Sequence, residues 1–222
     1  MIDWKTIDTV LFDMDGTVLD LHFDNYFWED LVPARYGERH GLSTAEASAL
    51  LRKRYESVKG TLDWYCLDFW SQSLAMDIPR LKEDIRHKIT LRPHALDFVQ
   101  QLRASGRQVM LVTNAHPGSL DLKMRHTGIA PHFDHMISSH TLKLAKENAG
   151  FWSALRERHD YDPRRTLLID DSLPVLRQAE KEGIRHLRAI HQPDSQRAPL
   201  HPEEFVQIEH FTDVMSGLDP RE

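Results

Sequence analysis

Apolar and polar residues follow two different patterns along the chain, and the more regular one begins at residue 90. There, short runs rich in β-branched residues alternate with amphipathic stretches. These runs, and one more near the N-terminus, predict strands over residues 9–12, 108–114, 135–138, 166–170 and 186–190. The stretches between them predict helices over residues 94–105, 118–127 and 147–159, and a fourth that ends at Glu182. Such alternation indicates a parallel sheet with crossover helices.

Residues 20–89 keep a helical period throughout and contain no convincing strand. Ser43 is a candidate N-cap within this segment, and a helix is expected to begin near Pro79. The other predicted helices of the segment span residues 24–36, 44–58 and 63–76.

The sheet therefore starts before this segment and resumes after it. We predict a core of residues 1–19 and 90–222 with residues 20–89 inserted as a helical cap. The expected fold class is α/β, a Rossmann-like parallel sheet with an α-helical insertion. Residues 191–202, with three prolines, predict an irregular segment.

The composition is that of a soluble globular protein, since 41% of the 222 residues are hydrophobic and 28% are charged. A net charge of −6 without a basic run argues against a nucleic acid polymer as partner. Cys66 is the single cysteine, which excludes an internal disulfide and a cysteine-based metal cluster. No signal peptide pattern and no apolar run of about 18 residues occur, so we expect a cytoplasmic protein outside the membrane.

The five residues after the first predicted strand, Asp13-Met14-Asp15-Gly16-Thr17, carry the strongest chemical signal. In a continuing strand the two acids would point to opposite faces, but a turn at Gly16 lets both face one pocket. One carboxylate can attack phosphorus while the other supplies and removes a proton. Taken alone, the motif is also compatible with a plain turn after a strand, although the catalytic interpretation is favoured.

Further polar elements follow in order along the chain: Thr113 with Asn114, Lys146, and Asp170 with Asp171. In open α/β sheets, ligands bind beyond the carboxyl ends of the strands, so Asp13, Thr113 and Asp170 are expected to meet in one crevice. Mg²⁺ prefers hard oxygen ligands. We expect it to bind Asp13, the backbone carbonyl of Asp15, and Asp170, with Asp171 holding a metal-bound water.

The remaining residues of the predicted site would act on a phosphate ester. The Thr113 hydroxyl can donate to phosphate oxygens, and Lys146 can neutralise charge on Asp13 and on the transferring group. Asp15 would protonate the leaving alkoxide and later deprotonate the attacking water.

In type and order, these residues resemble the four motifs of the haloacid dehalogenase (HAD) superfamily. The superfamily often carries a helical cap of the C1 type between its first and second motifs, similar in placement to residues 20–89. The resemblance implies a Mg²⁺-dependent phosphatase that forms an aspartyl-phosphate on Asp13. The motif lysine is commonly followed by Pro-Asp or Glu-Asp, which Lys146 is not. Lys143 is therefore an alternative, although the following Glu147 and Trp152 favour Lys146.

Segments outside the motifs narrow the resemblance to bacterial GMP/IMP nucleotidases: FDNYFW at 23–28, LDWYCLD at 62–68, TNAHP at 113–117 and PDS at 193–195. This implies hydrolysis of the 5′-phosphate of a purine mononucleotide. His116 and Asn114, next to the second motif, are candidates to contact that substrate. The other histidines, including His132, His135 and His140, are interpreted as solvated or core residues, and Asp24 as a surface acid.

Aromatic residues of the cap could stack a purine base, but at helical spacing most of them should fill the interior of the helical unit. Other functions stay open: a sugar-phosphate or phosphoglycolate-type phosphatase, a phosphomutase, a haloacid dehalogenase, or a phosphate-binding module without turnover. Asp15 argues against dehalogenation, which needs no acid at that position. The complete set of acids argues against a module without turnover.

Overall fold

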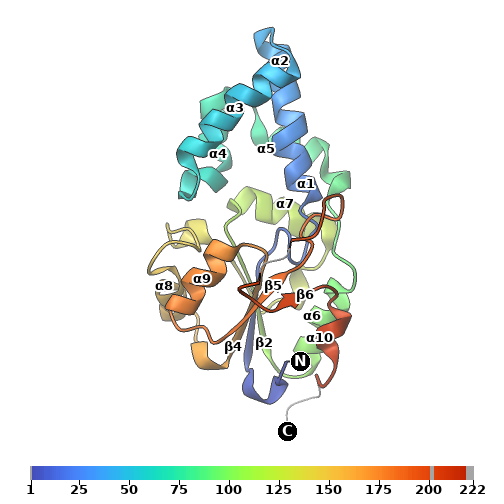
Figure 1. Ribbon diagram of the computed structural model, residues 1–222, viewed down its shortest axis with the longest axis vertical. Helices are drawn as coiled ribbons and strands as arrows, with labels where there is room; N and C mark the ends of the chain where they lie inside the picture. Colours follow the sequence, from blue (N-terminus) through green and yellow to red (C-terminus); the bar gives the residue numbers. More distant parts are fainter. Residues whose placement is uncertain (1, 201–202, 219–222) are drawn as a thin grey trace.

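The computed structural model describes residues 2–200 and 203–218. Within them, one parallel sheet of six strands lies between two layers of helices (Figure 1). The strand order is β3-β2-β1-β4-β5-β6. The strands are β1 (Thr9–Phe12), β2 (Gln108–Thr113), β3 (His135–Ser138), β4 (Thr166–Asp170), β5 (His186–Ile190) and β6 (Gln207–Ile208). The five predicted strands are confirmed to within one residue, and β6 is an edge strand that the pattern did not predict.

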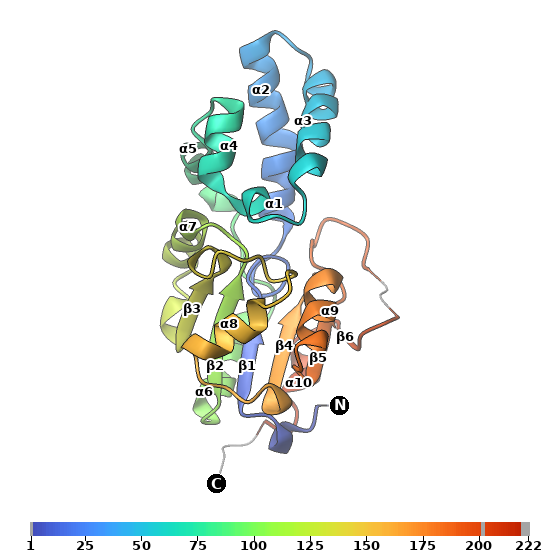
Figure 2. The ribbon, with the colours of Figure 1, turned by 90° about the vertical axis from the view of Figure 1, so that its left-hand side faces the viewer.

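Helices cover both faces of the sheet (Figure 2). One face is covered by α6 (Ala95–Ala104), α7 (Pro117–Thr127) and α10 (Thr212–Met215), and the other by α8 (Phe151–Arg158) and α9 (Leu173–Lys181). Val10 and Phe12 pack toward the first group, whereas Leu11 between them packs toward the second. Because β1 is buried on both faces, its residues from Val10 to Phe12 are all apolar and do not alternate with polar ones.

The core helices are confirmed with one correction. The helix predicted over residues 147–159 begins only at Phe151, because residues 147–150 form turns and Gly150 has a positive φ of 88°. Short 3-10 turns complete the connections: Trp4–Thr6, Leu62–Tyr65, Arg86–Lys88, Ala130–His132, Ser139–Thr141 and Pro163–Arg165. None of the described helices is both long and apolar enough to cross a membrane.

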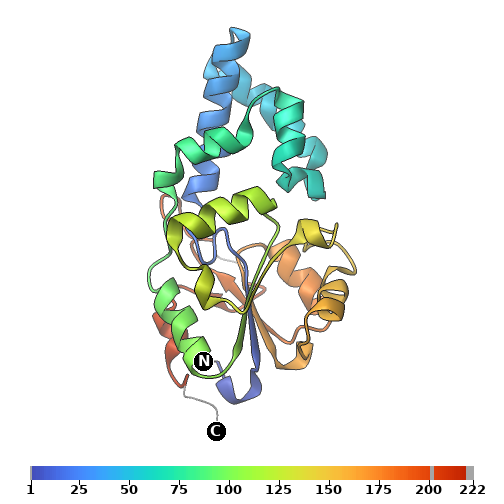
Figure 3. The same cartoon turned by 180° about the vertical axis from the view of Figure 1, so that it is seen from behind.

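Residues 20–89, called the helical insert below, stand beyond one end of the sheet (Figures 1 and 3). Their helices are α1 (His22–Tyr26), a π-helical turn (Phe27–Leu31), α2 (Val32–His40), α3 (Thr44–Val58), α4 (Leu67–Leu74) and α5 (Ile78–Asp84). Ser43 caps α3 in a capping box with Glu46, as predicted. The helix predicted over 63–76 was wrong in one respect: extended backbone at Cys66 separates a 3-10 turn from α4.

The two connections between the insert and the sheet lie side by side. Leu19 forms an antiparallel bridge with Leu91, and the Asp20 N–H donates to the Thr90 carbonyl at 3.0 Å. We therefore keep residues 20–89 as the proposed extent of the cap. In the predicted irregular segment, residues 191–200 contain neither helix nor strand, and residues 201–202 lie outside the described residues.

Candidate active site

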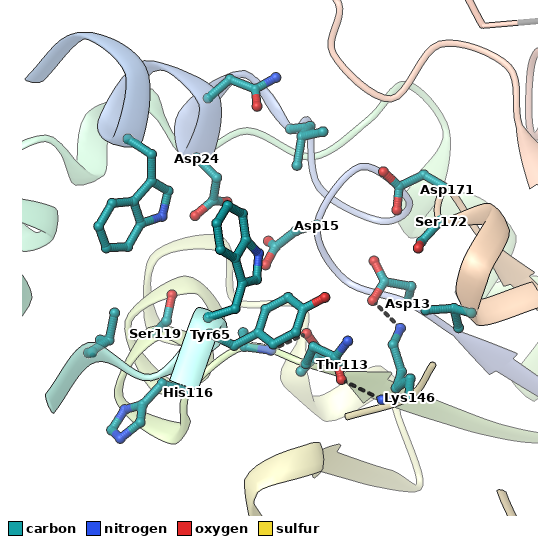
Figure 4. A pocket seen from close by; sticks show the side chains of 18 of the residues that line it. Asp13, Asp15, Asp24, Tyr65, Thr113, His116, Ser119, Lys146, Asp171 and Ser172 are labelled. Carbon is teal, nitrogen blue, oxygen red and sulfur yellow. Dashed lines mark hydrogen bonds and ion pairs between the residues drawn. The ribbon is translucent and has the colours of Figure 1, made fainter. Parts of the chain in front are cut away.

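A pocket of about 410 Å³ lies between the carboxyl ends of the central strands and the helical insert. The predicted site residues all line it: Asp13, Asp15, Thr113, Asn114, His116, Lys146, Asp170 and Asp171. Figure 4 shows Asp13, Asp15, Thr113 and Lys146 converging on this space. The sheet topology has thus brought together residues that are up to 158 positions apart, from Asp13 to Asp171.

Lys146 lies at the centre of the acids. Its Nζ donates to Asp13 Oδ1 at 2.5 Å, to Asp170 Oδ2 at 2.7 Å and to the Val112 carbonyl at 3.0 Å. Burial by itself would lower the pKa of Lys146, but the two carboxylates outweigh it and raise that pKa. The ammonium is therefore charged and fully hydrogen-bonded.

Asn114 holds the loop that carries this lysine. Its Oδ1 accepts from the Lys146 N–H at 2.9 Å, and its Nδ2 donates to Glu147 Oε2 at 2.8 Å. The Asn114 side chain therefore positions the lysine loop with both of its polar atoms. Lys143, the alternative lysine, is exposed and does not line the pocket.

Asp13, Asp170 and Asp171 bring carboxylate oxygens within 4.8 Å of one another. Gly16 makes room for this cluster, because a Cβ at that position would lie 2.5 Å from Asp171 Oδ2. Burial raises the pKa of Asp171 well above its usual range, and the neighbouring acids raise it further. Burial also raises the pKa of Asp13 to about 6, an effect that Lys146 partly offsets.

The donors of this cluster fit a hard divalent cation. Among the described residues, one ammonium in hydrogen-bond contact, that of Lys146, stands against three carboxylates, so the ionised cluster has an excess of negative charge. Uncompensated charge is costly in a buried site, and oxygen ligands suit Mg²⁺. Asp13 and Asp170 are placed to hold such an ion, and a carboxylate oxygen of Asp171 lies within 4.8 Å of theirs.

The Asp15 side chain belongs to a second group of charges. Lys123 Nζ donates to Asp15 Oδ1 at 2.6 Å and to Asp24 Oδ2 at 2.6 Å, and Lys82 Nζ donates to Asp24 Oδ1 at 2.6 Å. Burial raises the pKa of Asp15 to about 6 against the opposing effect of Lys123. For Asp24, burial acts in the same direction, but Lys123 and Lys82 together lower its pKa to about 2. The interpretation of Asp24 as a surface acid was therefore wrong.

Thr113 and His116 occupy the turn between β2 and α7. The Thr113 hydroxyl oxygen accepts from the Ala115 N–H at 3.0 Å, and its proton can donate to a phosphate oxygen. His116 caps α7, since its Nδ1 accepts from the Gly118 N–H at 3.1 Å. This tautomer places the ring proton on Nε2, which lies 3.5 Å from Asp68 of the insert.

Cys66 and His140 lie beside His116, with potential ligand atoms within 4.8 Å of one another. Sequence reasoning had excluded any metal cluster that uses cysteine. Nδ1 of His116 already accepts from the Gly118 N–H, so only Nε2 could bind a cation, and it would have to lose its proton to do so. We interpret the three side chains as a polar contact between the insert and the core.

The insert side of the pocket is aromatic, with Trp28, Tyr55, Trp64, Tyr65 and Trp70 in its wall. Several of these rings pack on one another: Tyr55 and Trp70 have centroids 5.1 Å apart and Trp28 and Trp70 5.8 Å apart. Tyr65 also connects the insert to the core, because its hydroxyl donates to Glu147 Oε1 at 3.0 Å. The insert thereby touches the loop that carries Lys146.

Sequence reasoning did not place the polar residues Asp24, Lys82 and Lys123 in the site. It considered Tyr65 only as an aromatic ring of the cap and Glu147 only as a residue that favours Lys146. Lys82 did leave a signal, since it lies four residues after the buried Ile78 and so on the same face of α5. Asp24 and Tyr65 lie within two of the segments that suggested the nucleotidase resemblance. Helical periodicity did not distinguish Lys123 from a solvated lysine.

Paired acids after the central strand, a buried lysine between the first of them and Asp170, and a helical insert over the pocket define a class of hydrolase. The family model for haloacid dehalogenase-like hydrolases matches residues 7–179, and the chain belongs to this family.

Among curated proteins, the chain is 44% identical over 217 residues to GMP/IMP nucleotidase YrfG of Escherichia coli (strain K12), covering 98% of each. It is 27% identical over 180 residues to (S)-2-haloacid dehalogenase H-109 of Pseudomonas putida, covering 76% of this chain and 78% of that protein. The crystal structure of a HAD phosphatase from Thermococcus onnurineus matches with a TM-score of 0.82 at 22% identity, covering 97% of this chain and 100% of that one. This last likeness is one of fold.

We expect Gly16→Ala to destabilise the protein more than Gly41→Ala. Both glycines have positive φ, 86° and 68°, which costs a residue with a Cβ about 1–2 kcal/mol. Only at Gly16 would the new methyl also meet a side chain, that of Asp171, whereas nothing lies within 4 Å at Gly41. Urea unfolding of both variants measures the difference. Equal losses would contradict the close approach.

Removal of Lys146 should cost about 3–5 kcal/mol of unfolding free energy, because Lys146→Met leaves Asp13 and Asp170 without their buried partner. The matched control is Lys143→Met, an exposed lysine three residues away, for which we expect a change within about 0.5 kcal/mol. Denaturant unfolding without Mg²⁺ provides the measurement. A small loss for Lys146→Met would show that the ion pair does not stabilise the fold.

Mg²⁺ should raise the melting temperature more at about pH 7.5 than at about pH 5. Burial raises the pKa of Asp13 to about 6 from an ordinary 3.8, so the folded state binds this proton more tightly than the unfolded chain. In the absence of metal, the stabilisation that protonated Asp13 gives to the folded state is present below pH 3.8 and is lost as pH rises through 6. Protons and Mg²⁺ compete for the same oxygens.

Differential scanning fluorimetry across pH, with and without Mg²⁺, tests this expectation. Asp170→Asn should remove most of the Mg²⁺-dependent increase, whereas the exposed Asp121→Asn should keep it. An increase of equal size at both pH values would place the ion somewhere other than at these acids.

Proposed function

We propose that the protein is a Mg²⁺-dependent phosphomonoester hydrolase that acts through an aspartyl-phosphate on Asp13, with a purine 5′-mononucleotide as substrate. The observation that carries this proposal is the pair of acids at the end of β1, each with its own lysine. Asp13 contacts Lys146 and Asp15 contacts Lys123, while both acids line one pocket. A nucleophile and a separate proton carrier are what ester cleavage at phosphorus needs.

In the first half-reaction, Asp13 attacks phosphorus. Lys146 holds Oδ1 of this carboxylate, so Oδ2 is the oxygen that can form the new bond. As the bond between phosphorus and the ester oxygen breaks, Asp15 gives its proton to the leaving alkoxide. The Thr113 hydroxyl donates to an oxygen of the transferring group.

In the second half-reaction, water attacks the phosphorus of the aspartyl-phosphate. Asp15, now a carboxylate, takes a proton from this water, and phosphate leaves while the Asp13 carboxylate is restored. A pKa of about 6 suits Asp15 to both steps, because it can hold and release a proton near neutral pH.

Asp13 and Asp170 would hold the metal together with the backbone carbonyl of Asp15, and Asp171 would orient a water on it. When bound, Mg²⁺ supplies charge neutralisation for the phosphoryl oxygens. The excess of carboxylates over ammonium groups in this cluster supports that assignment.

Two observations support a purine nucleotide as the substrate. The GMP/IMP nucleotidase of E. coli is 44% identical to this chain over 98% of its length. The cavity of about 410 Å³ lies within the usual range of small-molecule sites, and its aromatic wall offers faces on which a base can stack. With a single cysteine, the chain suits a reducing cytoplasm, where we infer that it acts.

A phosphate-release assay with Mg²⁺ tests chemistry and substrate together. The panel contains GMP, IMP, AMP and sugar phosphates, with halide release from chloroacetate followed in parallel. We expect GMP and IMP to be preferred and Asp13→Asn to lower turnover by more than about 1,000-fold. The exposed Asp121→Asn serves as a matched control and should retain activity.

Preference for a sugar phosphate would contradict the proposal of a purine nucleotide as substrate. Halide release without Mg²⁺ would contradict the proposed phosphatase reaction. Turnover that survives Asp13→Asn would contradict the proposed aspartyl-phosphate intermediate.

A further inference from the structure

The charges around Lys123 form an alternating series of acid and ammonium that crosses from the core to the insert. Asp15 follows β1 and Lys123 lies on α7, whereas Asp24 lies on α1 and Lys82 on α5. The two lysines are 1% and 2% exposed. Two ammonium groups balance two carboxylates, so the series is neutral as a whole.

Aromatic rings lie beside the two ammonium groups of this series. Lys123 Nζ lies 5.2 Å from the centroid of the Phe23 ring, and Lys82 Nζ lies 5.0 Å from Phe23 and 4.8 Å from Phe27. Phe23 and Phe27 are themselves buried. Ammonium groups packed in this way have few alternative positions, so the contact from Lys123 to Asp15 has a defined direction.

We propose that Lys123 is a positioning residue that orients the Asp15 carboxyl group for proton transfer and links this orientation to the helical insert through Asp24. The inference rests on the proposed function, in which Asp15 is the proton carrier. Lys123 holds Oδ1 of Asp15, which leaves Oδ2 to face a leaving group. The second contact of Lys123, with Asp24 Oδ2, fixes the ammonium against the insert.

Lys82 provides a control within the same series. It is buried to the same degree as Lys123 and donates to the same acid, Asp24, but its contact is with Oδ1 of that acid and not with Asp15. Loss of either lysine removes one buried cation and leaves Asp24 with a single partner. Only the loss of Lys123 removes the contact with Asp15.

The test compares two substrates that differ in their need for a proton. p-Nitrophenyl phosphate releases a phenolate that is stable without protonation, whereas benzyl phosphate releases an alkoxide that must be protonated as it leaves. A misplaced proton carrier slows the second reaction selectively, because general acid catalysis contributes about 100- to 10,000-fold. Damage to the fold lowers both rates together.

We expect Lys123→Met to raise the ratio of kcat/KM for p-nitrophenyl phosphate to that for benzyl phosphate by about 10- to 100-fold. Lys82→Met should leave this ratio unchanged. If both variants change the ratio equally, or neither does, the positioning role of Lys123 is overturned. Circular dichroism and unfolding curves show whether each variant is folded.

Two further variants keep the outcome decisive. Asp24→Asn retains both lysines and should raise the ratio by a smaller factor than Lys123→Met. It still tests the link to the insert if Lys123→Met does not fold. An unchanged ratio in Asp24→Asn would overturn the link to the insert. Asp15→Asn should raise the ratio at least as much as Lys123→Met. If Asp15→Asn lowers both rates equally, the proposed proton carrier is wrong, and this failure is distinct from that of Lys123.

Discussion

The arrangement of the site depends on one buried ammonium between two acids. Phe12 and Ile169 are paired in register on adjacent parallel strands, so the residues that follow them, Asp13 and Asp170, lie at the same level at the carboxyl ends of β1 and β4. Two carboxylates at this spacing in a buried site repel each other. Lys146 donates to both and makes their proximity tolerable. Because this lysine comes from a loop and not from the sheet, the contacts that hold the loop matter as much as the strands.

The two acids of the first motif are separated by one residue but belong to different electrostatic surroundings. Asp13 faces Lys146 and the end of β4, whereas Asp15 faces Lys123 and the insert. Met14 between them is fully buried, and the turn at Gly16 follows. Neighbouring carboxylates can take separate chemical roles because each has its own cation. The motif therefore contributes one acid to each of two charged clusters, Asp13 to that of Lys146 and Asp15 to that of Lys123.

The sequence predicted five of the six strands to within a residue, because the central strands are buried on both faces and consist mainly of apolar residues. It also predicted which polar residues meet, since strand ends converge by topology. It missed the break at Cys66, where the backbone departs from helical periodicity. It missed Lys123 because its partner Asp15 is 108 residues away and a lysine on an amphipathic helix normally faces water.

The pairing of Leu19 with Leu91 has a consequence for the evolution of the fold. Because the chain leaves and re-enters the core at one point, a short turn could replace the whole insert without disturbing the strand order. Such an exchange would replace the aromatic wall of the pocket and keep the acids at the strand ends. Core residues that contact the insert would be affected, and among them Lys123 would lose its partner Asp24. A donor module that lacked an acid at this place would leave the contacts of Asp13 with Lys146 intact, while the lysine that holds Asp15 would lose its second partner.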